Sequence, residues 1–246
     1  MRSEPLKTTM IKIGGFLFRW RDYLFPLTVL MLFAAVTPAK TIFGSAALEH
    51  NTDIVALLLI LSGVLIRMLV IGYVMVHRNG VAKVVHANEL YTKGMFGLCR
   101  NPLYLGNILI YVGAFLLHGA WPVAIGGTAL FLFVYYSIIF SEENYLQGRF
   151  GEDYTTYRNH TPRLLPRLSN WNASTAGMKF QWLRALRIED NVIAQAVFIA
   201  GLALWYESAA HSEGNAIPMI SIILLGGGTV FVLSMRLYKR ARRSKA

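Results

Sequence analysis

The sequence contains a single cysteine among its 246 residues, and only 15% of the residues are charged. One cysteine, Cys99, excludes an internal disulfide and every Cys-x-x-Cys metal or redox motif. Its neighbour Arg100 favours the thiolate form, whereas burial as a small packed side chain is the simpler alternative. Soluble domains carry about 25% charged residues, so this chain has too few of them to cover a water-facing surface.

Hydrophobic residues are abundant instead. They make up 55% of the chain and stand in long blocks rather than in short amphipathic periods. Such blocks predict an all-α polytopic membrane protein with about six transmembrane helices. The six blocks are Leu24–Val36, which can extend to Leu48, Ile54–Val76, Leu103–Leu117, Trp121–Phe140, Val192–Trp205 and Ile217–Leu237.

The placement of basic residues predicts how these helices cross the membrane. The net charge is +11, and Lys and Arg gather before the first block, after the second and fourth blocks, and at the end of the chain. Because basic connections stay in the cytoplasm, both termini are expected there, in the inner membrane if the host is a bacterium. A nucleic-acid partner is not expected, because it requires basic residues clustered on one folded face.

Polar residues gather at the two ends of one predicted helical hairpin. Arg100-Asn101-Pro102 precedes the third block, and the fourth block ends near the adjacent carboxylates Glu142 and Glu143. At about 1.5 Å per residue, the two arms return to the same membrane level. We therefore expect the two polar clusters to meet on the cytoplasmic side.

The Arg100 end of this hairpin is suited to an anionic group. Proline favours the first helical position, so Asn101 is expected to cap the helix, its side chain accepting from a free backbone N–H. That helix end is partly positive and Arg100 adds a full charge, so together they hold a carboxylate well. The alternative is an ordinary helix start with Arg100 at a lipid phosphate.

The other end of the hairpin needs a positive charge. Glu142 and Glu143 repel each other and gain little from the negative end of a helix. Nearby arginines can supply the cation, and so can a ligand with a positive centre. Tyr135 and Tyr136 lie within two turns of the carboxylates, so aromatic faces line the same wall.

These demands together suit one cofactor. S-adenosylmethionine fits them, because it carries a carboxylate for the helix end, positive groups for the acids and an adenine ring for the aromatic side chains. A Gly-rich turn after a strand, with which soluble methyltransferases often hold it, has no clear counterpart in the sequence. The sequence therefore predicts a cytoplasmic-side cofactor pocket with no Rossmann domain and no metal.

These residues resemble the membrane methyltransferase superfamily that contains isoprenylcysteine carboxyl methyltransferase and the phospholipid methyltransferases. The family pattern is Arg-His-Pro-x-Tyr, a Glu-Glu pair after a helical hairpin, Phe-Gly-x-x-Tyr-x-x-Tyr and a proline-containing stretch. Order and spacing match from about Asn88 to Pro166. The matching residues are Arg100-Asn101-Pro102-Leu103-Tyr104, Glu142-Glu143, Phe150-Gly151 with Tyr154 and Tyr157, and Pro162 with Pro166.

The resemblance implies a methyltransferase that uses S-adenosylmethionine and acts on a carboxylate, thiol or amine of a lipid or another lipophilic small molecule. Asn101 replaces a family His and cannot carry charge. Ile138 stands where isoprenylcysteine enzymes have a substrate-contacting Arg, which disfavours a prenylated protein as substrate. The resemblance assigns cofactor contacts to Asn88, Glu89, Leu90, Tyr91, Phe96, Asn101, Pro102, Leu103, Tyr104 and Glu142, and the charge argument adds Arg100 and Glu143.

Arg67 is a candidate outside this group. It lies in the second block, roughly at mid-bilayer, where a charged side chain costs at least about 2.5 kcal/mol. Contact with substrate is the predicted role, and pairing within the protein is the alternative.

We divide the chain into residues 1–80 with the N-terminal helices, 81–168 as the methyltransferase module, and 169–246 with a C-terminal helix pair.

Two other functions are open. A membrane reductase of the sterol-reductase type would favour basic residues around nucleotide phosphates over Glu142 and Glu143. A non-catalytic transporter or scaffold would spread polar residues through several helices at mid-membrane.

Overall fold

The computed structural model describes residues 4–38, 41, 44–74 and 89–211. No strand occurs within these ranges, which confirms the all-α prediction; this part of the chain holds no Rossmann sheet. The predicted sixth block, Ile217–Leu237, lies outside the described residues. The elements are α1 (Glu4–Ala35), α2 (Ala46–Tyr73), η1 (Gly94–Gly97), α3 (Pro102–Leu117), η2 (Val123–Gly127), α4 (Thr128–His160), η3 (Leu168–Asn170), α5 (Trp171–Thr175) and α6 (Trp182–His211).

Within the described ranges, three stretches of helix are long and apolar enough to cross a membrane: Ala47–Tyr73, Val123–His160 and Trp182–Ala209. A fourth apolar helix, α3, is shorter. Polar residues continue α4 and α6 beyond the predicted blocks, whereas α2 starts earlier than predicted and ends at Tyr73, before the predicted Val76. Most notably, α4 runs on from the apolar block to His160, with one non-helical residue at Gly151 (φ 53°).

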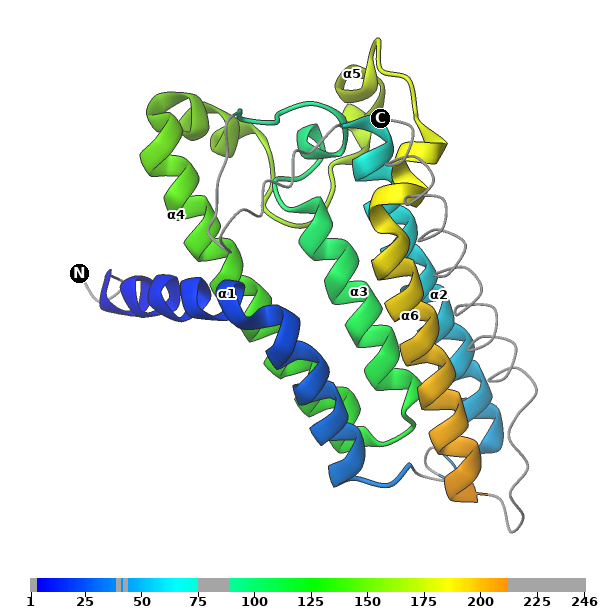
Figure 1. Ribbon diagram of the computed structural model, residues 1–246. Helices are drawn as coiled ribbons and strands as arrows, with labels where there is room; N and C mark the ends of the chain where they lie inside the picture. The colour runs from blue at the N-terminus through cyan, green and yellow to red at the C-terminus, as the bar shows by residue number, and fades with distance from the viewer. Residues whose placement is uncertain (1–3, 39–40, 42–43, 75–88, 212–246) are drawn as a thin grey trace, which may run out of the picture.

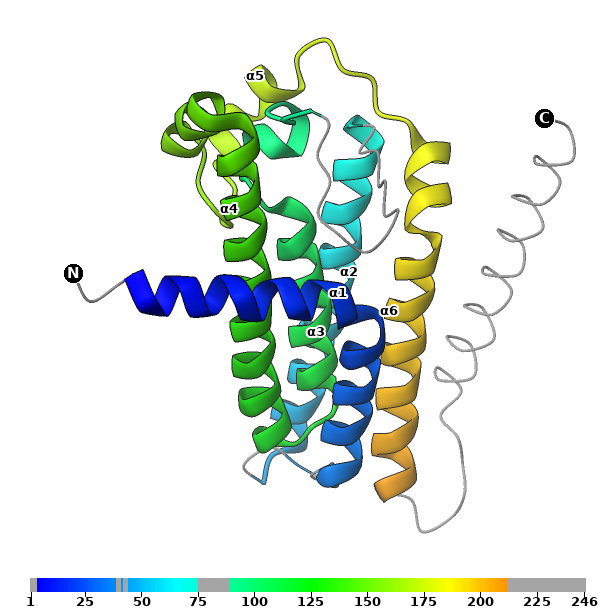
Figure 2. The same cartoon turned by 60° about the vertical axis from the view of Figure 1, so that its left-hand side comes forward.

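The helix α1 has two parts. Its first half lies across α4, and its second half turns and runs along the bundle (Figures 1 and 2). Pro26 lies inside α1, and an internal proline removes one backbone hydrogen bond and bends a helix. The predicted first block therefore corresponds to the second half of α1 only.

Small residues bring α2 and α3 close together. A methyl group at Gly113 of α3 would fall 2.5 Å from the carbonyl oxygen of Ala56 of α2. Seven residues earlier in α3 and seven residues later in α2, Gly106 lies similarly close to the backbone of Gly63. Close backbone approach through small residues is how helices associate where lipid gives no hydrophobic driving force.

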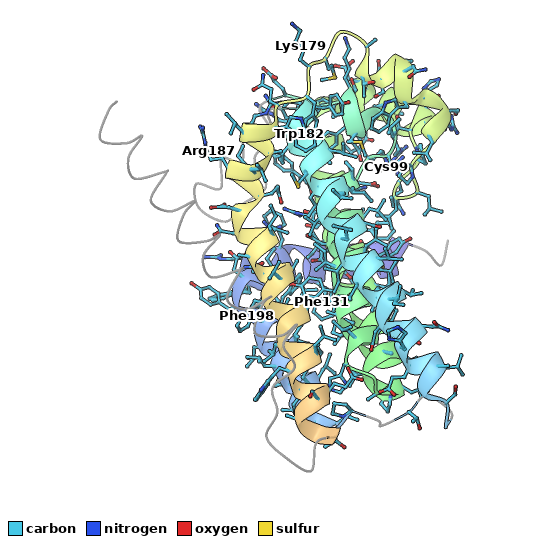
Figure 3. All side chains as sticks on the ribbon, turned by 90° about the vertical axis from the view of Figure 1, so that its right-hand side faces the viewer. Cys99, Phe131, Lys179, Trp182, Arg187 and Phe198 are labelled. Atoms are coloured by element: carbon cyan, nitrogen blue, oxygen red, sulfur yellow. The ribbon has the colours of Figure 1, made fainter. Side chains whose placement is uncertain are left out.

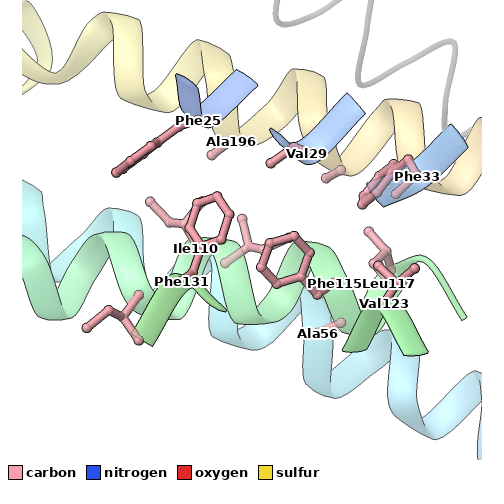
Figure 4. Close-up of a cluster of buried hydrophobic side chains, with 14 of the residues drawn as sticks. Phe25, Val29, Phe33, Ala56, Ile110, Phe115, Leu117, Val123, Phe131 and Ala196 are labelled. Atoms are coloured by element: carbon pink, nitrogen blue, oxygen red, sulfur yellow. The ribbon is translucent and has the colours of Figure 1, made fainter. Parts of the chain in front are cut away.

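The second half of α1 packs onto the α3–α4 hairpin through buried aromatic side chains. Phe25, Val29 and Phe33 of α1 face Phe115 of α3 and Phe131 of α4 (Figure 4). The ring centroids of Phe25 and Phe131 are 5.2 Å apart, within the range of favourable aromatic pairs. This cluster fixes the hairpin, and with it the polar residues at the hairpin's open end.

The predicted hairpin turn is confirmed. Helix α3 ends at Leu117, and Gly119 takes a left-handed conformation (φ 78°), donating its N–H to the carbonyl of Leu116 (3.1 Å). Glycine is the usual residue at this position because it has no Cβ to clash. The chain then returns through η2 into α4, so the start of α3 and the later turns of α4 lie at the end of the bundle that carries α5 (Figure 1).

Candidate functional site

The two polar clusters meet at Glu143, as the hairpin predicts. Glu143 is only 7% exposed. Its carboxylate accepts from Arg100 (Nε, 3.1 Å), Asn101 (Nδ2, 3.0 Å) and Arg163 (Nη2, 3.0 Å). Of the two cation sources left open by the sequence, the protein's own arginines supply the charge for Glu143.

Arg100 also fastens the segment that follows α4. Its Nη1 donates to the carbonyls of Arg158 (2.8 Å) and Thr161 (3.1 Å), and its backbone N–H donates to that of Pro162 (2.8 Å). Together with Glu143, Asn101 and Arg163, these bonds form what we call the Glu143 clamp. The clamp joins the start of α3, the body of α4 and the loop beyond it.

The prediction that the Asn101 side chain caps α3 is wrong. Asn101 is the N-cap residue and Pro102 takes the first turn, but no backbone N–H of the helix bonds to the amide. The amide instead donates to Glu143 and to the carbonyl of Arg163 (3.1 Å). The first N–H groups of a helix have no intrahelical partner, so this end of α3 keeps its capacity to bind an anion.

Glu142 has different surroundings from its neighbour. It is half-buried, and its Oε2 accepts a short hydrogen bond from the hydroxyl of Tyr104 (2.6 Å). The centre of the Tyr104 ring lies 5.9 Å from that of Tyr135, a buried residue of α4. No arginine in the described part of the chain forms an ion pair with Glu142 comparable to the two at Glu143. Glu142 is thus the acid with capacity for a further cation.

Two tyrosines after Gly151 line the same region. Tyr157 donates its hydroxyl to the carbonyl of Phe96 (2.7 Å) and so connects α4 to η1. Tyr154 is 1% exposed, yet its hydroxyl has no hydrogen-bond partner within the described ranges. It lies within electrostatic reach of Glu143, Arg100 and Glu142. A buried hydroxyl without a partner is costly, so this group is suited to a bound molecule.

The segment before Arg100 is near the site, and part of it is described. The rings of Tyr91 and Phe96 are 6.1 Å apart and both are half-buried, whereas Glu89 is exposed. Asn88 lies outside the described residues. Leu90 and Leu103 are half-buried and Pro102 is buried. The predicted cofactor contacts of all these residues stay predictions.

Arg67 is paired within the protein. Its Nε donates to Glu189 of α6 (2.7 Å) and its Nη1 to the side-chain carbonyl of Asn107 of α3 (2.7 Å). The side chains of Arg67 and Glu189 are 5% and 1% exposed. This is the alternative named for Arg67, and substrate contact stays a prediction. Glu189 was missed, although an acid at the start of an apolar block is a natural partner for a buried Arg.

Cys99 is fully buried and lies among the side chains at the end of the bundle that also carries Lys179 (Figure 3). Burial raises the pKa of the Cys99 thiol to about 12, since the charged thiolate loses its hydration. The expected effect of the neighbouring Arg100 is not seen. Arg100 points its charge at Glu143, and desolvation dominates.

Residues 52–153 match the phospholipid methyltransferase family. The match confirms the predicted resemblance to the membrane methyltransferase superfamily. The matching methyltransferase segment contains Arg67, Arg100, Tyr104, Glu142 and Glu143. Helix α1 precedes the segment, and Arg163 and Glu189 follow it.

Two curated proteins are similar to about half of the chain. One is the cobalt-zinc-cadmium resistance protein CzcN of Cupriavidus metallidurans, 31% identical over 49% of this chain and 53% of the relative. The other is the nickel-cobalt-cadmium resistance protein NccN of Alcaligenes xylosoxydans xylosoxydans, 34% identical over 48% of this chain and 59% of the relative. The chain thus spans little more than half the length of these relatives. No solved structure matches it.

Proposed function

We propose that this protein is an integral membrane methyltransferase that transfers a methyl group from S-adenosylmethionine to a lipophilic acceptor at the cytoplasmic side. The observation that carries the proposal is the short Tyr104–Glu142 hydrogen bond. It places an acid of α4 beside the uncapped end of α3, inside the segment that matches the methyltransferase family. An acid beside a helix N-terminus suits a ligand that carries both a positive and a negative group, since the acid attracts the first and the helix N-terminus the second.

The residues present fit this cofactor. The first N–H groups of α3 would hold its carboxylate, because a helix N-terminus binds anions. Glu142 would take its positive centre, and the Tyr154 hydroxyl would gain the partner it lacks. The half-buried rings of Tyr91 and Phe96 offer an apolar surface for its adenine.

The cofactor supplies an activated methyl group on a sulfonium. The displacement is in line, so the protein contributes mainly by positioning the reactants and by excluding water. Tyr104 holds the Glu142 carboxylate in place, and the Glu143 clamp holds the start of α3 against α4. A carboxylate or thiolate acceptor needs no general base, whereas an amine must lose a proton, and we assign no base.

The names of the two curated relatives refer to resistance to cobalt, zinc, cadmium and nickel. Resistance is a property of the cell and does not specify a reaction. Among the residues that the structure describes, no group of three or more His, Cys, Asp and Glu side chains could hold a metal ion. Our proposal rests on the site and on the segment that matches the methyltransferase family.

The Glu142→Gln variant tests the cofactor site. We expect it to abolish binding of S-adenosylmethionine without unfolding the protein, because it removes the charge opposite the sulfonium and keeps the shape. Calorimetry on purified protein in detergent measures the affinity. Glu152→Gln, an exposed acid later in α4, is the matched control. An unchanged affinity of Glu142→Gln for S-adenosylmethionine would refute the assignment. Tighter binding of a nicotinamide nucleotide than of S-adenosylmethionine would favour the reductase alternative.

The acceptor can be sought directly. Purified protein is incubated in native lipid with methyl-labelled cofactor, and the lipids are extracted and separated. Label that appears in a lipid fraction with the wild type, and is absent with Glu142→Gln, supports the proposed activity. Binding of the cofactor with no label in any lipid or small hydrophobic molecule contradicts a lipophilic acceptor.

A further inference from the structure

The first half of α1 reaches the candidate site, although it lies outside the segment that matches the methyltransferase family. Gly14 packs directly against the backbone of Ser137 of α4, and a Cβ on Gly15 would lie 3.5 Å from the hydroxyl of Ser141. Only glycine allows so close a crossing. Ser141 directly precedes Glu142, so the crossing brings α1 to the level of the carboxylates.

Arg21 lies about two turns after Gly14 on this helix. Its positive charge lies within electrostatic reach of the Tyr104 hydroxyl and the Glu142 carboxylate. Tyr104 in turn donates to Glu142. Arg21 of α1, Tyr104 of α3 and Glu142 of α4 therefore lie in one polar region.

The guanidinium of Arg21 is only partly occupied by contacts within the protein. Its side chain is 39% exposed, and the guanidinium carbon lies 4.4 Å from the centre of the Phe18 ring. Asp22 lies 3.7 Å away and is 71% exposed, so this ion pair is solvated and weak. A guanidinium has five N–H donors, and its exposed edge can bind a carboxylate or phosphate through two of them.

The surroundings of Arg21 place it at a membrane surface. Phe16, Trp20 and Tyr23 follow one another at helical spacing and are all exposed. Lys12 and Arg19 on the same half-helix are exposed as well. A helix that lies across a bundle with exposed aromatic and basic residues is typical of the interface between headgroups and acyl chains.

We propose that Arg21 binds the negatively charged headgroup of the methyl acceptor, which is an anionic lipid that enters the site along the first half of α1. This inference rests on the proposed function, because it takes the protein to methylate a lipophilic acceptor. It adds the class of that acceptor, an anionic lipid. The guanidinium stands between the headgroup and Glu142, so it also screens the two negative charges from each other. A zwitterionic lipid lacks the net charge that would favour this contact.

The test measures lipid binding without the cofactor. The protein is placed in bilayer discs of phosphatidylcholine that contain either brominated phosphatidylglycerol or brominated phosphatidylcholine, and quenching of tryptophan fluorescence is recorded. Trp20 is the reporter, and a Trp20→Phe background is subtracted. We expect the wild type to prefer phosphatidylglycerol and Arg21→Gln to lower that preference about fivefold, the size of one partly exposed ion pair.

Two further variants make the result specific. Arg21→Lys keeps the charge and should retain part of the preference, whereas Arg19→Gln removes an equal charge from the same half-helix and should leave the preference intact. Equal loss in Arg19→Gln and Arg21→Gln would mean general surface attraction only and would overturn the proposal, as would no change in Arg21→Gln. If methyl transfer to lipid persists in that case, the proposed function stands and only the role of Arg21 fails.

Discussion

At the scale of single residues, the adjacent acids Glu142 and Glu143 show how neighbours can have different roles. Glu143 is buried and bonded to two guanidinium groups and an amide, which makes it a structural centre. Glu142 is held by one hydroxyl and retains capacity for a cation. The sequence predicted that the pair needs positive charge, but it could not say which acid the arginines would take. Arg163 lies in a loop, whose path no periodicity reveals.

The ion pair between Arg67 and Glu189 gives a prediction about stability. Removing one partner of a buried pair leaves an uncompensated charge, so Arg67→Leu should lower the free energy of unfolding by roughly 3–5 kcal/mol. The double variant Arg67→Leu with Glu189→Leu should lose less, because no charge is stranded. Unfolding in mixed detergent micelles, followed by fluorescence, measures both. Full turnover in the double variant would show that Arg67 does not contact the substrate.

Cys99 gives a prediction about reactivity. With a pKa raised to about 12, the thiol stays protonated below that pH and gains reactivity only as the pH approaches it. Folded protein at pH 8 should therefore resist a maleimide reagent, and protein unfolded in dodecyl sulfate should be labelled within minutes. Rapid labelling of the folded form would show that the thiol is accessible and contradict its packed position.

At the scale of elements, the contact between α2 and α3 depends on the absence of side chains. Gly113→Ala should reduce the free energy of unfolding by about 1–3 kcal/mol, because the added methyl group would meet the backbone of Ala56. Gly148→Ala in α4 is the matched control, since nothing lies within 4 Å of its added methyl group. The control should be neutral or slightly stabilised, as alanine favours helix. Equal effects of the two variants would contradict the close packing.

Much of this arrangement could be predicted from the sequence, and the misses have physical reasons. Long apolar blocks indicate helices, Pro102 marks a helix start, and the turn near His118 and Gly119 reverses the chain. These signals together predicted that Arg100 lies close to the acid pair. The first half of α1 was not predicted as a helix because it mixes basic and apolar residues without a long apolar run. Its contact with α4 depends on glycines whose neighbours only the folded structure reveals.

At the scale of the whole molecule, three helices among the described residues are long and apolar enough to cross a membrane, and the distribution of basic residues predicts how the chain is oriented in it. In a bacterial host, a green fluorescent protein fused at either terminus should fluoresce, and alkaline phosphatase fused there should be inactive. A fusion that ends the chain at the turn near Gly119 should give the reverse pattern. Active phosphatase at both termini would invert the orientation and move the candidate site to the outer side.

The Glu143 clamp also bears on the order in which the protein is made. Its members are Arg100, Asn101, Glu143 and Arg163, and Arg163 follows the end of α4 at His160 by three residues. A nascent chain that stops before Arg163 therefore leaves Glu143 with a single guanidinium partner. The hairpin can enter the bilayer early, but its open end closes only after the ribosome has added the loop beyond α4. The contacts around Glu143 are therefore among the last of the hairpin to form during synthesis.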